Sequence, residues 1–366
     1  MKVHIIYTNY LTPDGARFSV GGIQTYLKAL SVVIRQIGLD VNLYQKSDIN
    51  FQKHVDGVNI YGYKDDGKHN IPEFLYANAK QYIDSSKDIL IFGCETMAVK
   101  TNGVYTIGIQ HGVFWDKPDY SNKPYWYMFF KKMYHAIKTI KRNQRLNQIV
   151  CVDYNFVNWY RSLVAYPKVS LNVVPNFSVV APLYSKPNDV VNIIFARRLF
   201  EYRGTRIFMK AIFRVLSEFE NIRVTIAGEG PDEDMMRTYL NKFGNVEFIR
   251  YNSEDSLSIH SDKHIAVIPT VGSEGTSLSL LEAMSAQCAV VCSNVGGMTN
   301  IVIDQYNGLM INPCEEDLYV SIKELIINQD LRDAISIKAY ETIKSGFSYE
   351  NWAERWKNII LSARQK

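Results

Sequence analysis

Short runs of β-branched and aliphatic residues recur along the chain, at intervals that leave room for a helix between them. Runs such as VHIIY at 3–7 and VNIIFA at 191–196 are apolar at nearly every position, which is typical of parallel strands buried on both faces. Helical patterns such as residues 206–219 separate most of the runs, and this alternation predicts doubly wound α/β sheets. The expected strands are 3–7, 41–44, 89–93, 105–110, 148–153 and 171–176, followed by 191–196, 223–228, 246–249, 265–269 and 289–294.

The predicted strands form two sets on either side of segment 177–189, which carries two prolines and ends in polar residues. A chain of 366 residues is long enough for two domains. We therefore expect Rossmann-like domains at residues 1–178 and 179–346. The remaining stretch, 347–366, is amphipathic and contains two tryptophans, so we expect a helix that covers a domain.

Composition narrows the class of protein. The chain is 47% hydrophobic and 21% charged with a net charge of +4, which argues against disorder and against general nucleic-acid binding. Five scattered cysteines suit a reducing compartment better than a disulfide framework or a zinc site. No stretch reaches the ~18 apolar residues that a spanning helix needs. We expect a cytoplasmic protein, or one that rests on a membrane surface without crossing it.

Segment 270–284 holds two glutamates, Glu274 before a predicted helix and Glu282 inside it. The helix is expected to begin directly after a glycine and two hydroxyl residues, which are natural N-caps. Free backbone N–H groups at such a helix start bind anions, and here the anion would be a diphosphate. The two glutamates would then lie on either side of the diphosphate, where their carboxylates could hold hydroxyl groups of the ligand. The residues of this predicted phosphate cradle are Gly275, Thr276, Ser277 and Leu278. The alternative interpretation is a capped helix with two solvent-exposed glutamates.

Further candidate residues follow predicted strands. Arg198 comes just after a strand and Arg203 comes five residues later, a placement that suits bidentate binding of a diphosphate. His111 also follows a strand, and Gly22 opens a helix soon after the first strand. Structural alternatives stay open for each of them: a basic surface turn, a structural histidine and an ordinary helix start.

The order of these residues resembles glycosyltransferase family 4, the retaining enzymes of the GT-B fold. The resemblance covers nearly the whole chain and rests on GGIQTY at 21–26, QHG at 110–112, RLFEYRG at 198–204, AGEGP at 227–231, the two glutamates eight residues apart, GG at 296–297 and NGL at 307–309. It implies an α/β architecture of two Rossmann-like domains facing a central cleft. It also implies that the C-terminal helix crosses back to the N-terminal domain.

The resemblance assigns roles residue by residue. Arg198 and Arg203 would neutralise the donor diphosphate, Glu282 would bind the nucleotide ribose, and Glu274 would hold hydroxyls of the donor sugar. His111 would contact the donor sugar from the N-terminal, acceptor-binding domain. Gly22 and the main chain around Arg250 complete the implied donor site, with the base paired near Arg250.

The chain departs from the family pattern at three places. Arg203 stands where the family usually has lysine, and Asn300 stands where it often has glutamate. Asn176–Val179 replaces a frequent N-G-[VI]-D motif. The last two departures affect the expected details of the donor side but not the expected fold.

The expected reaction is a hexosyl transfer with retained anomeric configuration. No D-x-D motif stands at a suitable strand end, and two arginines with a helix start already match the diphosphate, so we expect neither a metal nor a cofactor. The expected substrates are a nucleotide-diphosphate sugar and a lipid-linked glycan or glycolipid of bacterial O-antigen, capsule or other surface polysaccharide biosynthesis. The alternatives are a sugar-nucleotide epimerase on the same fold and a non-catalytic nucleotide-sugar-binding scaffold subunit.

Segment 120–152 contains no acidic residue and seven lysines and arginines. If it is helical, Trp126, Phe130, Met133, Ile137 and Ile140 form one apolar stripe. The basic residues that we expect to face anionic headgroups at the inner face of the plasma membrane are Lys131, Lys132, Lys138, Arg142 and Arg145. The alternative is a helix packed on the core with a solvated basic face.

Overall fold

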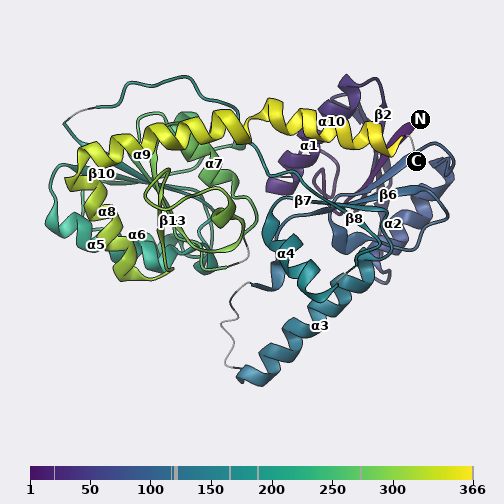
Figure 1. Ribbon diagram of the computed structural model, residues 1–366, viewed down its shortest axis with the longest axis horizontal. Helices are drawn as coiled ribbons and strands as arrows, with labels where there is room; N and C mark the ends of the chain where they lie inside the picture. Colours follow the sequence, from purple (N-terminus) through teal and green to yellow (C-terminus); the bar gives the residue numbers. More distant parts are fainter. Residues whose placement is uncertain are drawn as a thin grey trace. The chain divides into compact units, whose positions relative to one another are not determined.

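The computed structural model describes residues 1–19, 21–116, 118, 123–164, 166–187, 189–272 and 274–364 (Figure 1). Parts of three predicted segments lie outside the described residues: 120–122 of the basic segment, 188 of the linker and 365–366 of the last helix. Residue 273, next to Glu274, also lies outside them. The chain forms two compact units: Met1–His111 with Ser121–Pro175 and Trp352–Lys366, and Gly112–Tyr120 with Asn176–Asn351.

The N-terminal unit is built on a sheet whose described strands follow the order β3-β4-β2-β1-β5-β6-β7-β8. All neighbours are parallel except the edge pair β3 and β4. The strands are β1 (Lys2–Ile6), β2 (Asp40–Ser47), β3 (Phe51–Val55), β4 (Val58–Lys64), β5 (Ile89–Phe92), β6 (Tyr105–Gln110), β7 (Gln148–Cys151) and β8 (Ser170–Val173). The helices are α1 (Gly22–Gln36), α2 (Ile71–Ala79), α3 (Tyr125–Asn143), α4 (Tyr154–Leu163) and α10 (Tyr349–Ala363).

The C-terminal unit is built on a parallel sheet whose described strands follow the order β11-β10-β9-β12-β13-β14. The strands are β9 (Val191–Ala196), β10 (Ile222–Ala227), β11 (Val246–Ile249), β12 (Ile265–Ile268), β13 (Ala289–Ser293) and β14 (Leu309–Ile311). The helices are α5 (Thr205–Glu218), α6 (Glu233–Leu240), α7 (Leu278–Ser285), α8 (Glu315–Ile327) and α9 (Gln329–Thr342).

Strand periodicity divides the core of the C-terminal unit into two layers. Ile193 and Phe195 of β9 pack in one layer, which includes residues of α5, α6 and α8. Ile194 and Ala196, the alternate residues of the same strand, pack in the other layer with α7 and Ala339 of α9. Because side chains alternate between the faces of a strand, a strand covered on both faces must be apolar throughout. This explains the near-continuous apolar runs in the sequence.

The predicted fold class, two doubly wound α/β domains, is confirmed. Every predicted strand corresponds to an observed one, whereas β3, β4 and β14 were not predicted. β3 and β4 form an antiparallel hairpin around Asp56 and Gly57, whose φ angles of 49° and 75° suit an Asp-Gly turn. This edge hairpin is partly polar, so it lacks the continuous apolar run that marks a central strand.

The last helix completes the N-terminal unit, as predicted. Trp356 of α10 is fully buried, and its Nε1 donates a hydrogen bond of 2.7 Å to the hydroxyl of Tyr26 on α1. Trp352 contacts the same tyrosine ring edge-on at 5.1 Å between centroids. Figure 1 shows α10 lying beside α1, although the whole chain separates the two helices in sequence.

Replacing Trp356 with alanine should lower the free energy of unfolding by about 3–5 kcal/mol, because it leaves a cavity and removes a hydrogen bond to the buried hydroxyl of Tyr26. Thermal or denaturant unfolding followed by circular dichroism measures this loss. The matched control is Trp126→Ala, which removes a tryptophan that is 63% exposed on α3 and should cost under about 0.5 kcal/mol. Equal losses in the two variants would contradict the assigned role of α10.

Candidate functional site

One buried carboxylate gathers the polar residues of the C-terminal unit. The Oε2 atom of Glu274 accepts hydrogen bonds from Arg197 Nη2 at 2.6 Å and from the hydroxyl of Thr270 at 3.0 Å. Arg203 donates to the same oxygen, and Arg197 also donates to Thr270. Two guanidinium groups therefore share one carboxylate, in a charge-assisted network that fixes all four side chains.

The order of strands explains why these residues meet. Arg197 follows β9 and Thr270 follows β12, and these strands are neighbours in the sheet. Arg203 lies in the short turn between β9 and α5. Carboxyl ends of parallel strands lie along one edge, which is where ligands of open α/β sheets bind.

The electrostatics of the cluster keep Glu274 ionised. Its side chain is only 11% exposed, and burial by itself disfavours the charged form. The positive charges of Arg197 and Arg203 outweigh burial, so the pKa of Glu274 is lowered below its ordinary value. The carboxylate thus neutralises part of the charge of two buried arginines and holds their guanidinium groups in place.

Glycines allow the loops of this edge to touch through their backbones. A Cβ atom on Gly204 would lie 2.0 Å from the carbonyl oxygen of Pro269, and one on Gly296 would lie 2.0 Å from that of Glu274. Both glycines also have positive φ angles, 86° and 57°. The backbone N–H of Gly297 donates to Glu274 O at 3.1 Å. Any larger residue at these positions would push the loops apart.

Helix α7 begins where the sequence predicts, at Leu278 with Ser277 as its N-cap residue. The Ser277 side chain makes no capping hydrogen bond and lies 3.2 Å from the hydroxyl of Ser279 instead. Asn176 Nδ2 donates to the carbonyl oxygen of Thr276 at 2.6 Å and so fixes the segment that leads into the helix. The N–H groups of the first turn of a helix favour an anion.

Glu282 lies inside α7 in an environment unlike that of Glu274. It is partly buried, it accepts a hydrogen bond from Ser256, and Tyr251 lies near enough to feel its charge. Burial raises the pKa of Glu282 to about 7. Both glutamates are thus at least partly buried, in contrast to the alternative of two solvent-exposed glutamates.

The structure brings Arg203 and Glu274 together but leaves two other predicted residues outside this cluster. Arg198 is exposed, and its guanidinium lies 5.8 Å from the centre of the Phe200 ring. Arg250 is 71% exposed and lies 3.4 Å from a carboxylate oxygen of Glu233. Arg197, which directly follows the last residue of β9, was not predicted as a site residue. The register of that strand was the available signal, since adjacent arginines cannot both point into the sheet edge.

The two candidate residues of the N-terminal unit, His111 and Gly22, lie at the end of a strand and at the start of a helix. His111 follows β6, and its Nε2 lies 2.8 Å from the carbonyl oxygen of Gly93, to which it can only donate. Burial lowers the pKa of His111 to about 4, so the imidazole is neutral at neutral pH. Its ring packs edge-on against Tyr26 at 5.3 Å. Gly22 is the first residue of α1, which has no side-chain cap.

Among the described residues, one group has atoms close enough together to hold a metal ion. Ligand atoms of Asp65, Asp66 and His69 lie within 4.8 Å of one another in the N-terminal unit. The carboxylates already lie near lysines, with Lys46 Nζ 3.2 Å from Asp65 and Lys68 Nζ 3.6 Å from Asp66. This group belongs to a different unit from Glu274.

Most of the C-terminal unit is similar to a known protein family. Residues 184–342 match the family model of glycosyl transferases group 1. An uncharacterized glycosyltransferase of Methanocaldococcus jannaschii is 26% identical over 216 residues, covering 56% of this chain and 54% of that protein. The lipopolysaccharide 1,2-N-acetylglucosaminetransferase of Salmonella typhimurium is 22% identical over 214 residues, covering 52% of this chain and 56% of that protein. The chain thus spans about half the length of the curated relatives it matches.

A solved structure matches the fold over the whole chain. Anabaena Alr3699/HepE in complex with UDP superimposes with a TM-score of 0.74 at 12% identity, covering 99% of this chain and 100% of that one. At this identity the likeness concerns the fold alone. Together with the family match, it confirms the resemblance predicted from the sequence.

The opposite environments of the two glutamates predict a pH dependence of stability. Because the folded pKa of Glu282 is raised, folding favours its protonated form, and its contribution to stability is lost as pH rises from about 4.5 to about 7. The free energy of unfolding of the parent protein should therefore fall by roughly 2–3 kcal/mol because of Glu282 when the pH rises from 5 to 8. A Glu282→Gln variant cannot ionise at this position, so this part of the decrease should be absent from it. Denaturant unfolding across this range measures the difference.

The control for this pH series is Glu254→Gln, which removes an exposed carboxylate from the same unit. It should leave the shape of the stability profile unchanged. Parallel profiles for the parent and Glu282→Gln would contradict the buried environment described for Glu282.

Proposed function

Since residues 184–342 match the family model of glycosyl transferases group 1, we propose that this chain is a retaining, metal-independent hexosyltransferase. The donor is a nucleotide-diphosphate sugar, and the acceptor is a lipid-linked glycan of bacterial lipopolysaccharide or other surface polysaccharide. A relative named as a lipopolysaccharide N-acetylglucosaminetransferase supports this choice of acceptor. Helix α3 of the N-terminal unit, which has a basic and aromatic surface, supports it as well.

The observation that carries the proposal is the Arg197–Arg203–Glu274 network at the carboxyl edge of the C-terminal sheet. A nucleotide diphosphate carries its charge on the two phosphates, and guanidinium groups bind such oxygens in bidentate fashion. The network holds two guanidinium groups beside the start of α7, whose backbone N–H groups also favour an anion. Exposed Arg198 on the same edge adds a third positive charge that can move to the diphosphate.

These residues would act mainly on the leaving group. As the bond between the sugar and the diphosphate breaks, negative charge grows on the phosphate oxygens, and preorganised positive groups lower that barrier. Metal-independent transfer follows from this proposal, because arginines and a helix start supply the charge that a divalent cation would otherwise supply.

Retention fits the same arrangement. The carboxylate of Glu274 is held by two arginines and a threonine, so it is poorly placed to serve as a nucleophile on the sugar. In the proposed mechanism the acceptor attacks from the face that the phosphate leaves, and the departing phosphate takes the acceptor proton. His111, a neutral hydrogen-bonding group, is the residue that we assign to the hydroxyls of the donor sugar.

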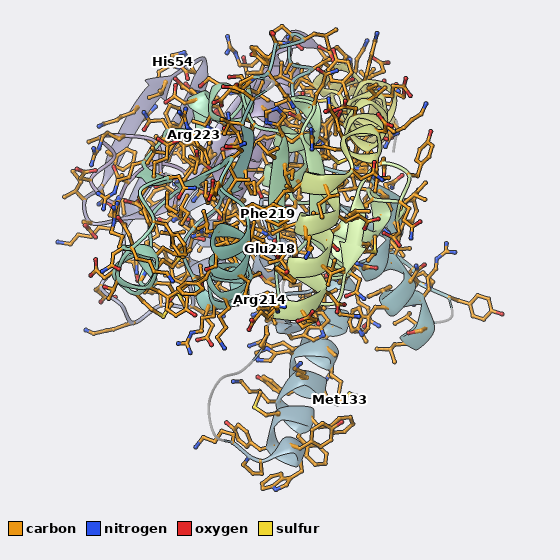
Figure 2. The ribbon with its side chains drawn as sticks, turned by 90° about the vertical axis from the view of Figure 1, so that its left-hand side faces the viewer. His54, Met133, Arg214, Glu218, Phe219 and Arg223 are labelled. Atoms are coloured by element: carbon orange, nitrogen blue, oxygen red, sulfur yellow. The ribbon has the colours of Figure 1, made fainter. Side chains whose placement is uncertain are left out.

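Helix α3 provides the proposed contact with the membrane. Its first turns carry exposed aromatic residues, and most of the predicted apolar stripe is exposed: Trp126, Phe130, Met133 and Ile137. Figure 2 shows Met133 and its neighbours standing clear of the other described elements of their unit. The predicted alternative, in which this stripe packs on the core, does not hold for those four residues. Contiguous exposed apolar surface of this kind marks an interaction site.

The charges of α3 suit an anionic lipid surface. Exposed Lys131 and Lys138, together with Arg145 just beyond the helix, lie among the aromatic residues with no acidic residue in the helix. An amphipathic helix that combines basic and aromatic side chains lies in the headgroup region of anionic bilayers. Within the described residues, no helix combines the length and the apolar character needed to span a membrane.

The catalytic proposal predicts that Arg198→Met lowers turnover by about 10²–10³-fold, since it removes a charge that stabilises the leaving group. Thermal stability should not change, because Arg198 is exposed and no described carboxylate lies within ion-pair distance of it. The donor is first identified as the nucleotide sugar that raises the melting temperature of the protein in a screen. Release of its nucleoside diphosphate with a glycolipid acceptor, in EDTA, then measures turnover.

The control for this assay is Arg223→Met, which removes an exposed arginine at the amino end of β10 (Figure 2). Its turnover should match that of the parent protein. Loss of activity in EDTA would contradict metal independence. Inverted configuration at the anomeric carbon, seen by NMR of the product, would contradict the retaining mechanism. Conversion of the donor without transfer to an acceptor would instead favour the epimerase alternative, and donor binding without any turnover would favour the scaffold alternative.

The membrane proposal predicts that the protein sediments with vesicles containing phosphatidylglycerol and is released by salt. Each basic residue near the surface contributes about 1 kcal/mol, so Lys131→Gln with Lys138→Gln should weaken binding roughly 20–30-fold at low salt. The control pair is Lys64→Gln with Lys68→Gln, on exposed residues elsewhere in the same unit, which should bind like the parent. Binding that depends neither on anionic lipid nor on salt would rule this interface out.

A further inference from the structure

The C-terminal unit holds a polar cavity at the sheet edge opposite the arginine–glutamate network. The cavity has a volume of about 320 Å³, which lies at the lower end of the range for small-molecule sites. Val191 begins β9, His264 directly precedes β12, and Gln287 precedes β13, so the cavity lies at the amino ends of these strands. Strand β9 alone separates the two edges by roughly 20 Å, so one small ligand cannot occupy both sites.

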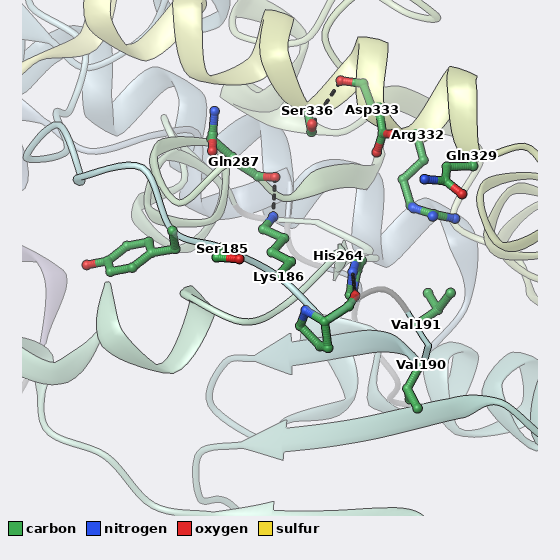
Figure 3. A pocket seen from close by; sticks show the side chains of 12 residues that line it. Ser185, Lys186, Val190, Val191, His264, Gln287, Gln329, Arg332, Asp333 and Ser336 are labelled. Atoms are coloured by element: carbon green, nitrogen blue, oxygen red, sulfur yellow. Dashed lines mark hydrogen bonds between the residues drawn. The ribbon is translucent and has the colours of Figure 1, made fainter.

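Two cationic side chains line this cavity without carboxylate partners. Lys186 Nζ donates to the backbone oxygen of Gln287, and Figure 3 shows this bond beside the cavity. Among the described residues, no carboxylate lies within ion-pair distance of Lys186 or Arg332. Burial lowers the pKa of Lys186, and the nearby charge of Arg332 lowers it further, although Asp333 and Asp262 oppose this effect.

Hydrogen bonds to the backbone of α8 fix the side chain of Arg332 at the wall of the cavity. The residue is only 7% exposed, and its Nη1 donates to the carbonyl oxygens of Leu325 at 2.7 Å and Ile326 at 3.3 Å, in the last turn of α8. Its buried Nε has no hydrogen-bond partner. A buried guanidinium without a carboxylate partner is costly, and the charge of an anion bound in the cavity would offset that cost.

The other polar groups of the cavity set its shape more than its charge. The backbone N–H of Asn192 donates to His264 Nδ1 at 3.0 Å, so the ring proton is on Nε2, which donates to Pro187 O at 2.9 Å. His264 is therefore neutral and fully paired, and it ties segment 184–187 to the sheet. Neutral donors that remain on the wall include Ser185 and Gln329, and Asp333 is the one carboxylate among the described lining residues.

We propose that this cavity is a binding site for a small phosphate monoester of monosaccharide size, held by Lys186 and Arg332. The phosphate oxygens accept from the Lys186 ammonium, the guanidinium of Arg332 supplies a second positive charge beside them, and neutral side chains such as Gln329 contact the rest of the ligand. A terminal phosphate offers enough acceptors for two cations and several neutral donors, which a single carboxylate does not. The site is independent of the proposed transfer reaction, because it lies at the other edge of the sheet.

The test is calorimetric titration of the full chain with glucose 6-phosphate. Lys186→Gln should weaken binding about 10-fold or more, since it removes one of two charges while an amide can still reach Gln287. Asp333→Asn should tighten binding several-fold, because it removes the negative charge of the wall. The matched control is Lys210→Gln, which removes an exposed lysine of α5 in the same unit and should leave binding unchanged.

A variant of the opposite edge separates this site from the donor site. Arg203→Gln should bind glucose 6-phosphate like the parent protein while it loses nucleotide-sugar binding. Three results would overturn the proposal: no binding by the parent protein at millimolar ligand, equal binding by Lys186→Gln, or loss of binding in Arg203→Gln. The last result would mean that the phosphate occupies the arginine–glutamate network instead.

Discussion

Burying the carboxylate of Glu274 is the constraint on which the C-terminal unit depends. An ionised group loses its hydration when it is buried, and it stays charged only if fixed positive charges and donors replace the water. Arg197 and Arg203, from the loop after β9, and Thr270, from the loop after β12, provide that replacement. The loops can meet only because glycines such as Gly204 and Gly296 leave room for backbone-to-backbone contact. Burial of the ionised Glu274 therefore requires both the positive charges around it and the glycines that let the loops approach one another.

The same constraint distinguishes the two glutamates. Glu274 remains an anion that holds two arginines, whereas burial raises the pKa of Glu282, which accepts a hydrogen bond from Ser256, to about 7. Two residues of one sequence motif thus present different chemistry to a ligand. One organises positive charge along the sheet edge, and the other can donate or accept a hydrogen bond, depending on its protonation.

Much of the fold was predictable from the sequence because central parallel strands must be apolar on both faces. The start of α7 at Leu278 was predictable for a similarly local reason, since a glycine and hydroxyl residues precede it. Arg197 was not, because the choice between adjacent arginines depends on where β9 ends and which side each residue faces. The exposure of Trp126 and Phe130 also escaped prediction, since an apolar helical stripe looks the same whether it meets a core or a partner.

The N-terminal unit draws its parts from both ends of the chain. Tyr26 packs edge-on against His111 and accepts a hydrogen bond from Trp356, so the last helix supports the surroundings of His111. The unit takes residues Trp352–Lys366 as its final piece, after the entire C-terminal unit. During synthesis, the domain that leaves the ribosome first must therefore wait for the residues from Trp352 onward to be translated before it can finish folding. A chain cut short by even its final helix would carry a complete second domain and an unfinished first one.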